Sequence, residues 1–175
     1  MLKTGWWSLR ARYTEDERET RNEDDELQKV SYVFEADLYT HALTLNYEPV
    51  SNNSKIPAYT QKCVCTMDAF PDNASLGESI TINLNAEYIG KNDYAGISDT
   101  YWIYSNDERV KIVNNDGYAK GDVFVGDSTA EARDTLKTSF TVTFPTELKE
   151  TDNEFYIYLE SYCGKSVFIY EWEHR

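Results

Sequence analysis

Few residues in this chain of 175 combine the right chemistry for catalysis or metal binding. It has three cysteines and two histidines. Cys63 and Cys65 are two apart, so on a strand their thiols share one face and run parallel, which disfavours a disulfide between them. Either could meet Cys163 in an oxidising compartment. Because the number of cysteines is odd, we expect thiols buried in the core.

The two histidines offer little to a catalytic or zinc site. His174 is the penultimate residue, where chains are usually mobile, and His41 lies among apolar neighbours. Their spacing to the cysteines matches no familiar zinc pattern, and no nucleophile elbow or phosphate-binding glycine loop is present. Asp116, Asp122 and Asp127 lack the spacing of a calcium loop, so a solvated loop is expected there. We therefore predict no catalytic residue, metal or cofactor, and a protein that is not an enzyme.

The strongest unusual signal is aromatic. Residues 155–172 are typical of two strands joined by a turn at 163–166, where Gly164 supplies the backbone freedom. Aliphatic and aromatic residues alternate on both arms, which predicts one aliphatic and one aromatic face. With a neighbouring strand at 101–104, we expect seven binding residues on one outer face. They are Trp102, Tyr104, Tyr156, Tyr158, Phe168, Tyr170 and Trp172.

Such an aromatic face has two interpretations. Residues 1–50 could lie across it, with Trp6, Trp7, Tyr32 and Phe34 as cover. Alternatively, it is a surface that binds a protein or a glycan, because monomers rarely expose large apolar patches and interfaces are rich in aromatic rings.

Alternation predicts further strands at 5–13, 61–69, 78–89, 109–113 and 140–144. In residues 30–47 the alternation slips near Leu38, which indicates one bent strand or two successive strands, with a helix as the competing prediction. The charged run 14–29 opens with a capping-box pattern and is expected to be a short solvated helix or a loop. A similar pattern at 128–131 predicts one or two helical turns.

Residues 48–59 hold two prolines and a Ser/Asn cluster, which is typical of a boundary. We therefore predict an N-terminal β hairpin or extension at 1–50, a linker at 51–59 and a main domain at 60–175. Strands separated by turns over the main domain favour an all-β, antiparallel sandwich. The stretch 76–82, LGESITI, resembles the opening of bacterial immunoglobulin-like domains. That resemblance implies an immunoglobulin-like β-sandwich over 60–175, and a role as an adhesion or spacer module.

The formal net charge of −14, from 31 acidic and 17 basic residues, disfavours direct contact with nucleic acid or with anionic membranes. No apolar run is long enough to span a bilayer, so no membrane insertion is expected. The N-terminal residues lack the apolar core of a secretory signal. We expect a cytoplasmic protein if Met1 is the native start, and an extracellular or surface protein if the chain is an excised mature domain.

These observations lead to one expected function and two alternatives. The first is a non-catalytic protein–protein interaction or structural module, with a protein partner. The second is a small acidic inhibitor, of the immunity, anti-CRISPR or DNA-mimic type, that caps a basic site on a target protein. The third is a carbohydrate-binding module that uses the aromatic face.

Overall fold

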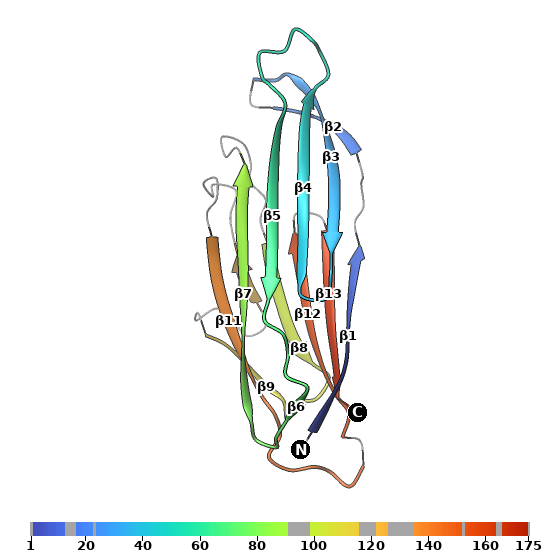
Figure 1. The fold of residues 1–175 in the computed structure, drawn as a ribbon, viewed down its shortest axis with the longest axis vertical. Helices are drawn as coiled ribbons and strands as arrows, with labels where there is room; N and C mark the ends of the chain where they lie inside the picture. Colours follow the sequence, from blue (N-terminus) through green and yellow to red (C-terminus); the bar gives the residue numbers. More distant parts are fainter. Residues whose placement is uncertain are drawn as a thin grey trace.

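The chain forms two antiparallel β-sheets that pack face to face (Figure 1). This computed structural model describes residues 2–12, 17–22, 24–90, 99–115, 122–125, 135–151, 153–163 and 166–174, with side chains at 17–22, 24–90, 103–115, 137–151 and 153–160. Over those residues there is no helix, and the ladders between neighbouring strands are antiparallel. The all-β antiparallel class is confirmed, while the immunoglobulin-like resemblance stays a prediction.

The first sheet has seven strands in the order β2-β3-β4-β5-β7-β11-β9. Their bounds are β2 Glu17–Arg21, β3 Leu27–Ala36, β4 Thr40–Pro49, β5 Tyr59–Met67, β7 Ser79–Gly90, β9 Lys111–Asn114 and β11 Thr135–Thr143. The second sheet has six strands in the order β10-β8-β12-β13-β1-β6. Their bounds are β1 Leu2–Arg12, β6 Asn73–Ala74, β8 Asp99–Ser105, β10 Asp122–Val125, β12 Phe155–Cys163 and β13 Ser166–His174.

Strict alternation in the sequence creates the core between the sheets. On β7, Leu84 and Ala86 are buried while Thr81 and Asn83 are exposed, as the pattern predicts. The second sheet contributes apolar side chains to the same cluster. Its buried members are Ile103, Phe155, Ile157 and Leu159. The other face of each sheet is turned away from this core.

Residues 27–49 form a hairpin of two successive strands, which confirms one of the two strand predictions and excludes the helix. Ala36 pairs with His41, so even-numbered residues of β3 lie opposite odd-numbered residues of β4. This pairing explains the slip in alternation near Leu38. In the charged run before it, β2 stands where a short helix or loop was expected. The helical turns predicted at 128–131 lie outside the described residues.

The predicted linker at 51–59 lies in the loop between two paired strands, except for Tyr59, which is the first residue of β5. β4 and β5 are neighbours with eight aligned residue pairs, from Thr40 opposite Thr66 to Tyr47 opposite Tyr59. Ser54 Oγ donates to Glu26 Oε2 at 2.7 Å, which ties the loop to the segment before β3. The seven-stranded sheet is thus continuous across the boundary that the sequence suggested.

Residues 1–50 supply strands to both sheets. β1 pairs with β13 along the edge of the closing hairpin, whereas β3 and β4 belong to the other sheet. Tyr32 and Phe34 pack against the core between the sheets. The first interpretation of the aromatic face, in which residues 1–50 lie across it, therefore does not hold for the described strands.

Candidate functional site

Three of the seven predicted binding residues lie together on the outer face of the six-stranded sheet. Tyr104 of β8 stands directly opposite Tyr158 of β12, and their rings stack with centroids 4.9 Å apart and planes 18° apart. Tyr156, two residues along β12, stacks on Tyr158 at 6.2 Å and 14°. Tyr104 is 43% exposed. The structure therefore places these three rings as a stacked row that reaches solvent.

Trp102 occupies the same face by register. It aligns with Glu160 of β12, two positions from Tyr104 on β8. Because directly opposite residues of a ladder share a face, Trp102 belongs to the outer face with Tyr104 and Tyr158. Its side chain is outside the part that the structure describes, so its position is known only from the backbone.

Phe168, Tyr170 and Trp172 do not share that face. The hairpin pairs Cys163 with Ser166, so each odd-numbered residue of β12 lies opposite an even-numbered residue of β13. Trp172 is thereby aligned with Ile157, on the face of β12 that is buried against the core. The prediction of one aromatic face made from both arms is corrected by this register. A binding role for the three residues stays a prediction, and their side chains are not described.

Two glutamates complete the row, Glu154 directly before β12 and Glu160 on β12, and the sequence analysis missed both. Tyr104 Oη donates to Glu160 Oε1 at 2.7 Å, and Tyr156 Oη donates to Glu154 Oε2 at 3.2 Å. Glu154, Tyr156, Tyr158 and Glu160 follow one another at steps of two, which was readable in the sequence as one face of a strand. We call these four residues and Tyr104 the tyrosine–glutamate patch.

A tight turn after β8 fixes the start of β12. The side chain of Asn106 accepts a hydrogen bond from Tyr156 N at 2.7 Å and donates to Glu154 O at 3.3 Å. In the same turn, the guanidinium of Arg109 donates to both carboxylate oxygens of Asp107. That contact lowers the pKa of Asp107 to about 2. The hydrogen bonds of this turn therefore help to position the patch, together with the strand pairing of the sheet.

The predicted core thiols are where alternation placed them. Cys63 and Cys65 are 0% and 1% exposed, with their sulfurs 3.5 Å apart in hydrogen-bond contact. His41 aligns with Cys65 across the ladder and is also buried. In the described ranges, no group of three or more His, Cys, Asp or Glu residues could hold a metal ion. The side chains of Cys163 and His174, and those of the aspartates considered for calcium, are not described.

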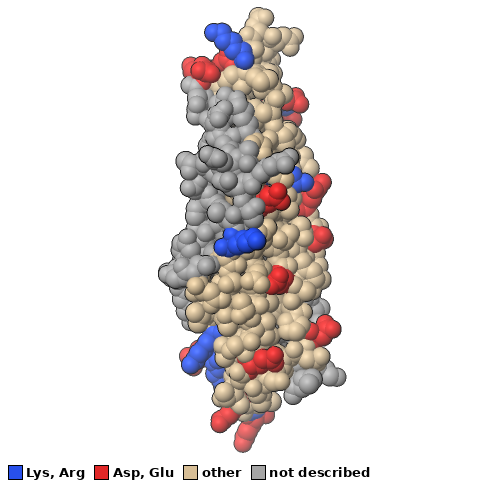
Figure 2. All heavy atoms as spheres, turned by 60° about the vertical axis from the view of Figure 1, so that its left-hand side comes forward, with Lys and Arg blue, Asp and Glu red and all other residues tan. Residues whose placement is uncertain are grey.

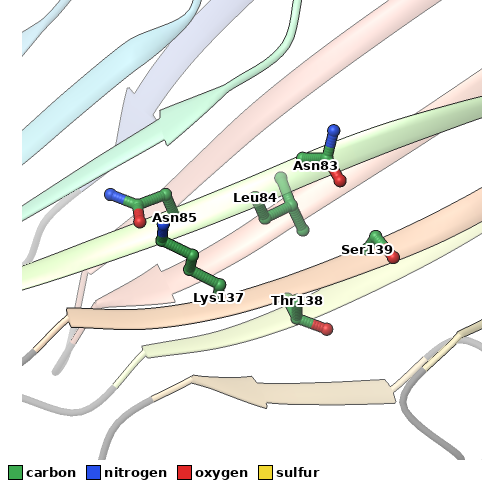
Figure 3. Close-up of a pocket in the computed structure, with 6 residues that line it drawn as sticks. All are labelled: Asn83, Leu84, Asn85, Lys137, Thr138 and Ser139. Carbon is green, nitrogen blue, oxygen red and sulfur yellow. The ribbon is translucent and has the colours of Figure 1, made fainter.

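A shallow depression of about 500 Å³ lies on the β7–β11 ladder of the other sheet (Figure 3). It is lined by Asn83, Leu84, Asn85, Lys137, Thr138 and Ser139. These groups are amides, hydroxyls, one ammonium and an aliphatic side chain, with neither a carboxylate nor a histidine among them. The lining is that of a polar surface on the sheet.

A second aromatic group, of which the sequence analysis named only Tyr32, lies on the inner side of the seven-stranded sheet. Tyr47 and Tyr59 stack at 4.5 Å, and the guanidinium of Arg18 sits over the ring of Tyr32 at 5.6 Å. Burial raises the pKa of Tyr47, Tyr32 adds to the rise and Arg18 opposes it. Because Tyr32 and Tyr47 pack against the core, this group stabilises the fold.

On the described part of the face seen in Figure 2, Asp and Glu side chains are spread along the length of the molecule, with a few Lys and Arg side chains between them. Among the described residues of that face, the acidic side chains do not gather into one area. No helix in the described residues is long and apolar enough to cross a membrane. Comparison with protein-family models, curated proteins and solved structures finds no match to this chain.

Proposed function

We propose that the chain is a non-catalytic protein-binding module whose contact surface is the tyrosine–glutamate patch. The observation that carries the proposal is the stacked row of Tyr104, Tyr158 and Tyr156, which extends to solvent on an outer sheet face. Tyrosines combine a large apolar area with a polar tip and lose little conformational entropy on binding, which is why they are enriched at interfaces. Because stacking and hydrogen bonds already hold the rings of this row in place, the row loses still less conformational entropy on binding.

Ring orientation favours a protein partner over a glycan. Sugars stack on the faces of aromatic rings, but here Tyr104 and Tyr156 each stack on Tyr158, at centroid distances of 4.9 and 6.2 Å, which covers part of those faces. What the row offers is ring edges and hydroxyl groups. Side chains and backbone groups of another protein pack on such a ridge, and the carbohydrate alternative is correspondingly less supported.

The test is capture of proteins from cells that make this chain. The wild-type protein and a Tyr104→Ala, Tyr158→Ala variant are immobilised, and retained proteins are quantified by mass spectrometry. We expect at least one protein that the wild type retains and the variant loses by about tenfold or more, because central aromatic residues carry most of the energy of an interface.

A matched control truncates exposed apolar side chains on the opposite face. Val33 and Ile89 are 44% and 37% exposed on the seven-stranded sheet, and the Val33→Ala, Ile89→Ala variant should retain the same proteins as the wild type. Circular dichroism confirms that each variant is folded. Equal retention by all three proteins, or no retention above empty beads, would refute the proposed function.

A further inference from the structure

The depression on the β7–β11 ladder is bordered by four polar side chains that form the corners of a rectangle. Asn85 stands directly opposite Lys137. Two residues along the same ladder, Asn83 stands opposite Ser139 in the same way (Figure 3). Residues two apart on a strand are about 7 Å apart, and residues opposite each other on neighbouring strands are about 5 Å apart. The space between the four side chains therefore has about the breadth of one sugar ring.

Three of these corners have groups that can bond a ligand. Neither the carboxamide of Asn85 nor the ammonium of Lys137 has a hydrogen bond or ion pair with any residue that the structure describes. The amide nitrogen of Asn83 donates to Asp68 Oδ2 at 2.6 Å, which fixes this side chain and leaves its carbonyl oxygen as an acceptor. The depression therefore offers a carboxamide, an ammonium and a carbonyl oxygen held in place.

This set of groups matches a ligand that is polar but uncharged. A carboxamide has a donor and an acceptor side by side, so it can bond two neighbouring hydroxyl groups of one ligand at once. A cation finds no carboxylate in the described lining, and an anion meets one ammonium, with Glu87 two positions from Asn85 on β7 and a net charge of −14 on the chain. The described lining also lacks the aromatic and arginine side chains that anchor protein interfaces.

We propose that this depression binds a neutral glycan, with Asn85 and Lys137 as its main hydrogen-bonding residues. Its volume of about 500 Å³ lies in the range of sites for small ligands and has room for a short run of sugar units. Thr66 of β5 is exposed and aligns with Asn85 on the side away from Lys137, so polar side chains continue across three strands. The glycan site and the tyrosine–glutamate patch lie on different sheets, so each can exist without the other.

An NMR titration of the isotope-labelled protein with maltohexaose, cellohexaose, chitohexaose and mannohexaose tests this site. Hydrogen bonds that replace contacts with water give weak binding, so we expect a dissociation constant of about 0.1–5 mM for at least one of these probes. The Asn85→Ala, Lys137→Ala variant should bind that probe about tenfold more weakly or worse, because it loses the groups that bond the sugar hydroxyls.

The matched control removes one carboxamide and one ammonium elsewhere on the same sheet. Asn46 of β4 and Lys62 of β5 lie outside the depression. The Asn46→Ala, Lys62→Ala variant should bind the probe within about twofold of the wild type. Circular dichroism confirms that both variants are folded. Equal weakening by the two variants would overturn the inference.

Three further outcomes would also overturn it. One is that none of the four probes shifts an amide signal at about 10 mM. Another is that binding is lost in the Tyr104→Ala, Tyr158→Ala variant and kept in Asn85→Ala, Lys137→Ala, which would place the glycan on the aromatic row. The third is that Asn85→Ala, Lys137→Ala loses captured proteins while no glycan binds, which would make the depression a protein contact.

Discussion

The Asp107–Arg109 pair shows how one turn positions the candidate surface. Arg109 Nη2 lies 2.6 Å from Asp107 Oδ2, and its guanidinium sits 5.1 Å from the centre of the Phe155 ring. Phe155 is the first residue of β12 and is fully buried. The pair therefore links the turn after β8 to the core under the start of β12.

Replacing Asp107 by Asn should destabilise the fold by about 1 kcal/mol at pH 7, because a charged, bidentate partner of Arg109 is lost. The pKa of Asp107 is lowered from 3.8 to about 2 in the folded protein, so its contribution is present above pH 4 and disappears as the pH falls from 4 to 2. Urea unfolding of both proteins from pH 7 to pH 2 measures this difference.

The neighbouring Glu108 provides the control for that measurement. It is exposed on the same turn, and Glu108→Gln should leave stability within about 0.5 kcal/mol of the wild type. A stability difference between Asp107→Asn and the wild type that stays constant down to pH 2 would contradict the ionic origin of the effect.

At the scale of elements, the alternation of residue types along the sequence located the strands, but it did not show how neighbouring strands are paired. Each strand of the closing hairpin was readable on its own, yet the sequence analysis placed Tyr156 and Trp172 on one face. A pairing of odd with even residues depends on how many residues the turn holds, and one residue more or fewer reverses every face. The turn between β3 and β4 likewise pairs even-numbered with odd-numbered residues, which explains the slip in alternation near Leu38.

The candidate site was partly predictable for the same reason. The sequence analysis singled out Tyr104, Tyr156 and Tyr158 as members of an aromatic face. It did not single out Glu154 and Glu160, because the chain has 31 acidic residues and the sequence does not distinguish these two from the others. Only the contact between a tyrosine hydroxyl and a carboxylate separates these two glutamates from the rest, and that contact with Tyr104 crosses from β8 to β12.

The end of β7 approaches β5 so closely that only glycine fits there. Gly90 has φ +134°, and a Cβ on it would meet the carbonyl oxygen of Thr60 and lie 2.9 Å from the Cα of Gln61. Both neighbours are backbone, so Gly90→Ala should lower the free energy of unfolding by about 1–3 kcal/mol. Urea unfolding of this variant beside Ile89→Ala, at an exposed position of the same strand, measures the effect. Identical urea midpoints for Gly90→Ala and the wild type would show that β5 and β7 can move apart at Gly90 without a loss of stability.

At the scale of the whole molecule, we expect the two sheets to unfold as one cooperative unit, because both contribute side chains to one core. Deleting residues 1–59 removes β1, which lies between β13 and β6, and also removes β2, β3 and β4 from the other sheet. We expect the fragment 60–175 to remain unfolded or to aggregate, because both sheets lose paired strands and core side chains such as Leu43. Circular dichroism and size-exclusion chromatography measure this outcome. A monomeric fragment with a sharp thermal transition would restore the division into an extension and a main domain.

The two ends of the chain lie close together at one pole of the molecule (Figure 1), and Thr4 is aligned with His174 in an antiparallel ladder. A force that pulls these ends apart would open β1 from β13 like a zipper, and would load one pair of hydrogen bonds at a time. A domain pulled from opposite poles would share the load across a whole ladder. We therefore expect the fold to open at a low force when it is pulled at these two ends.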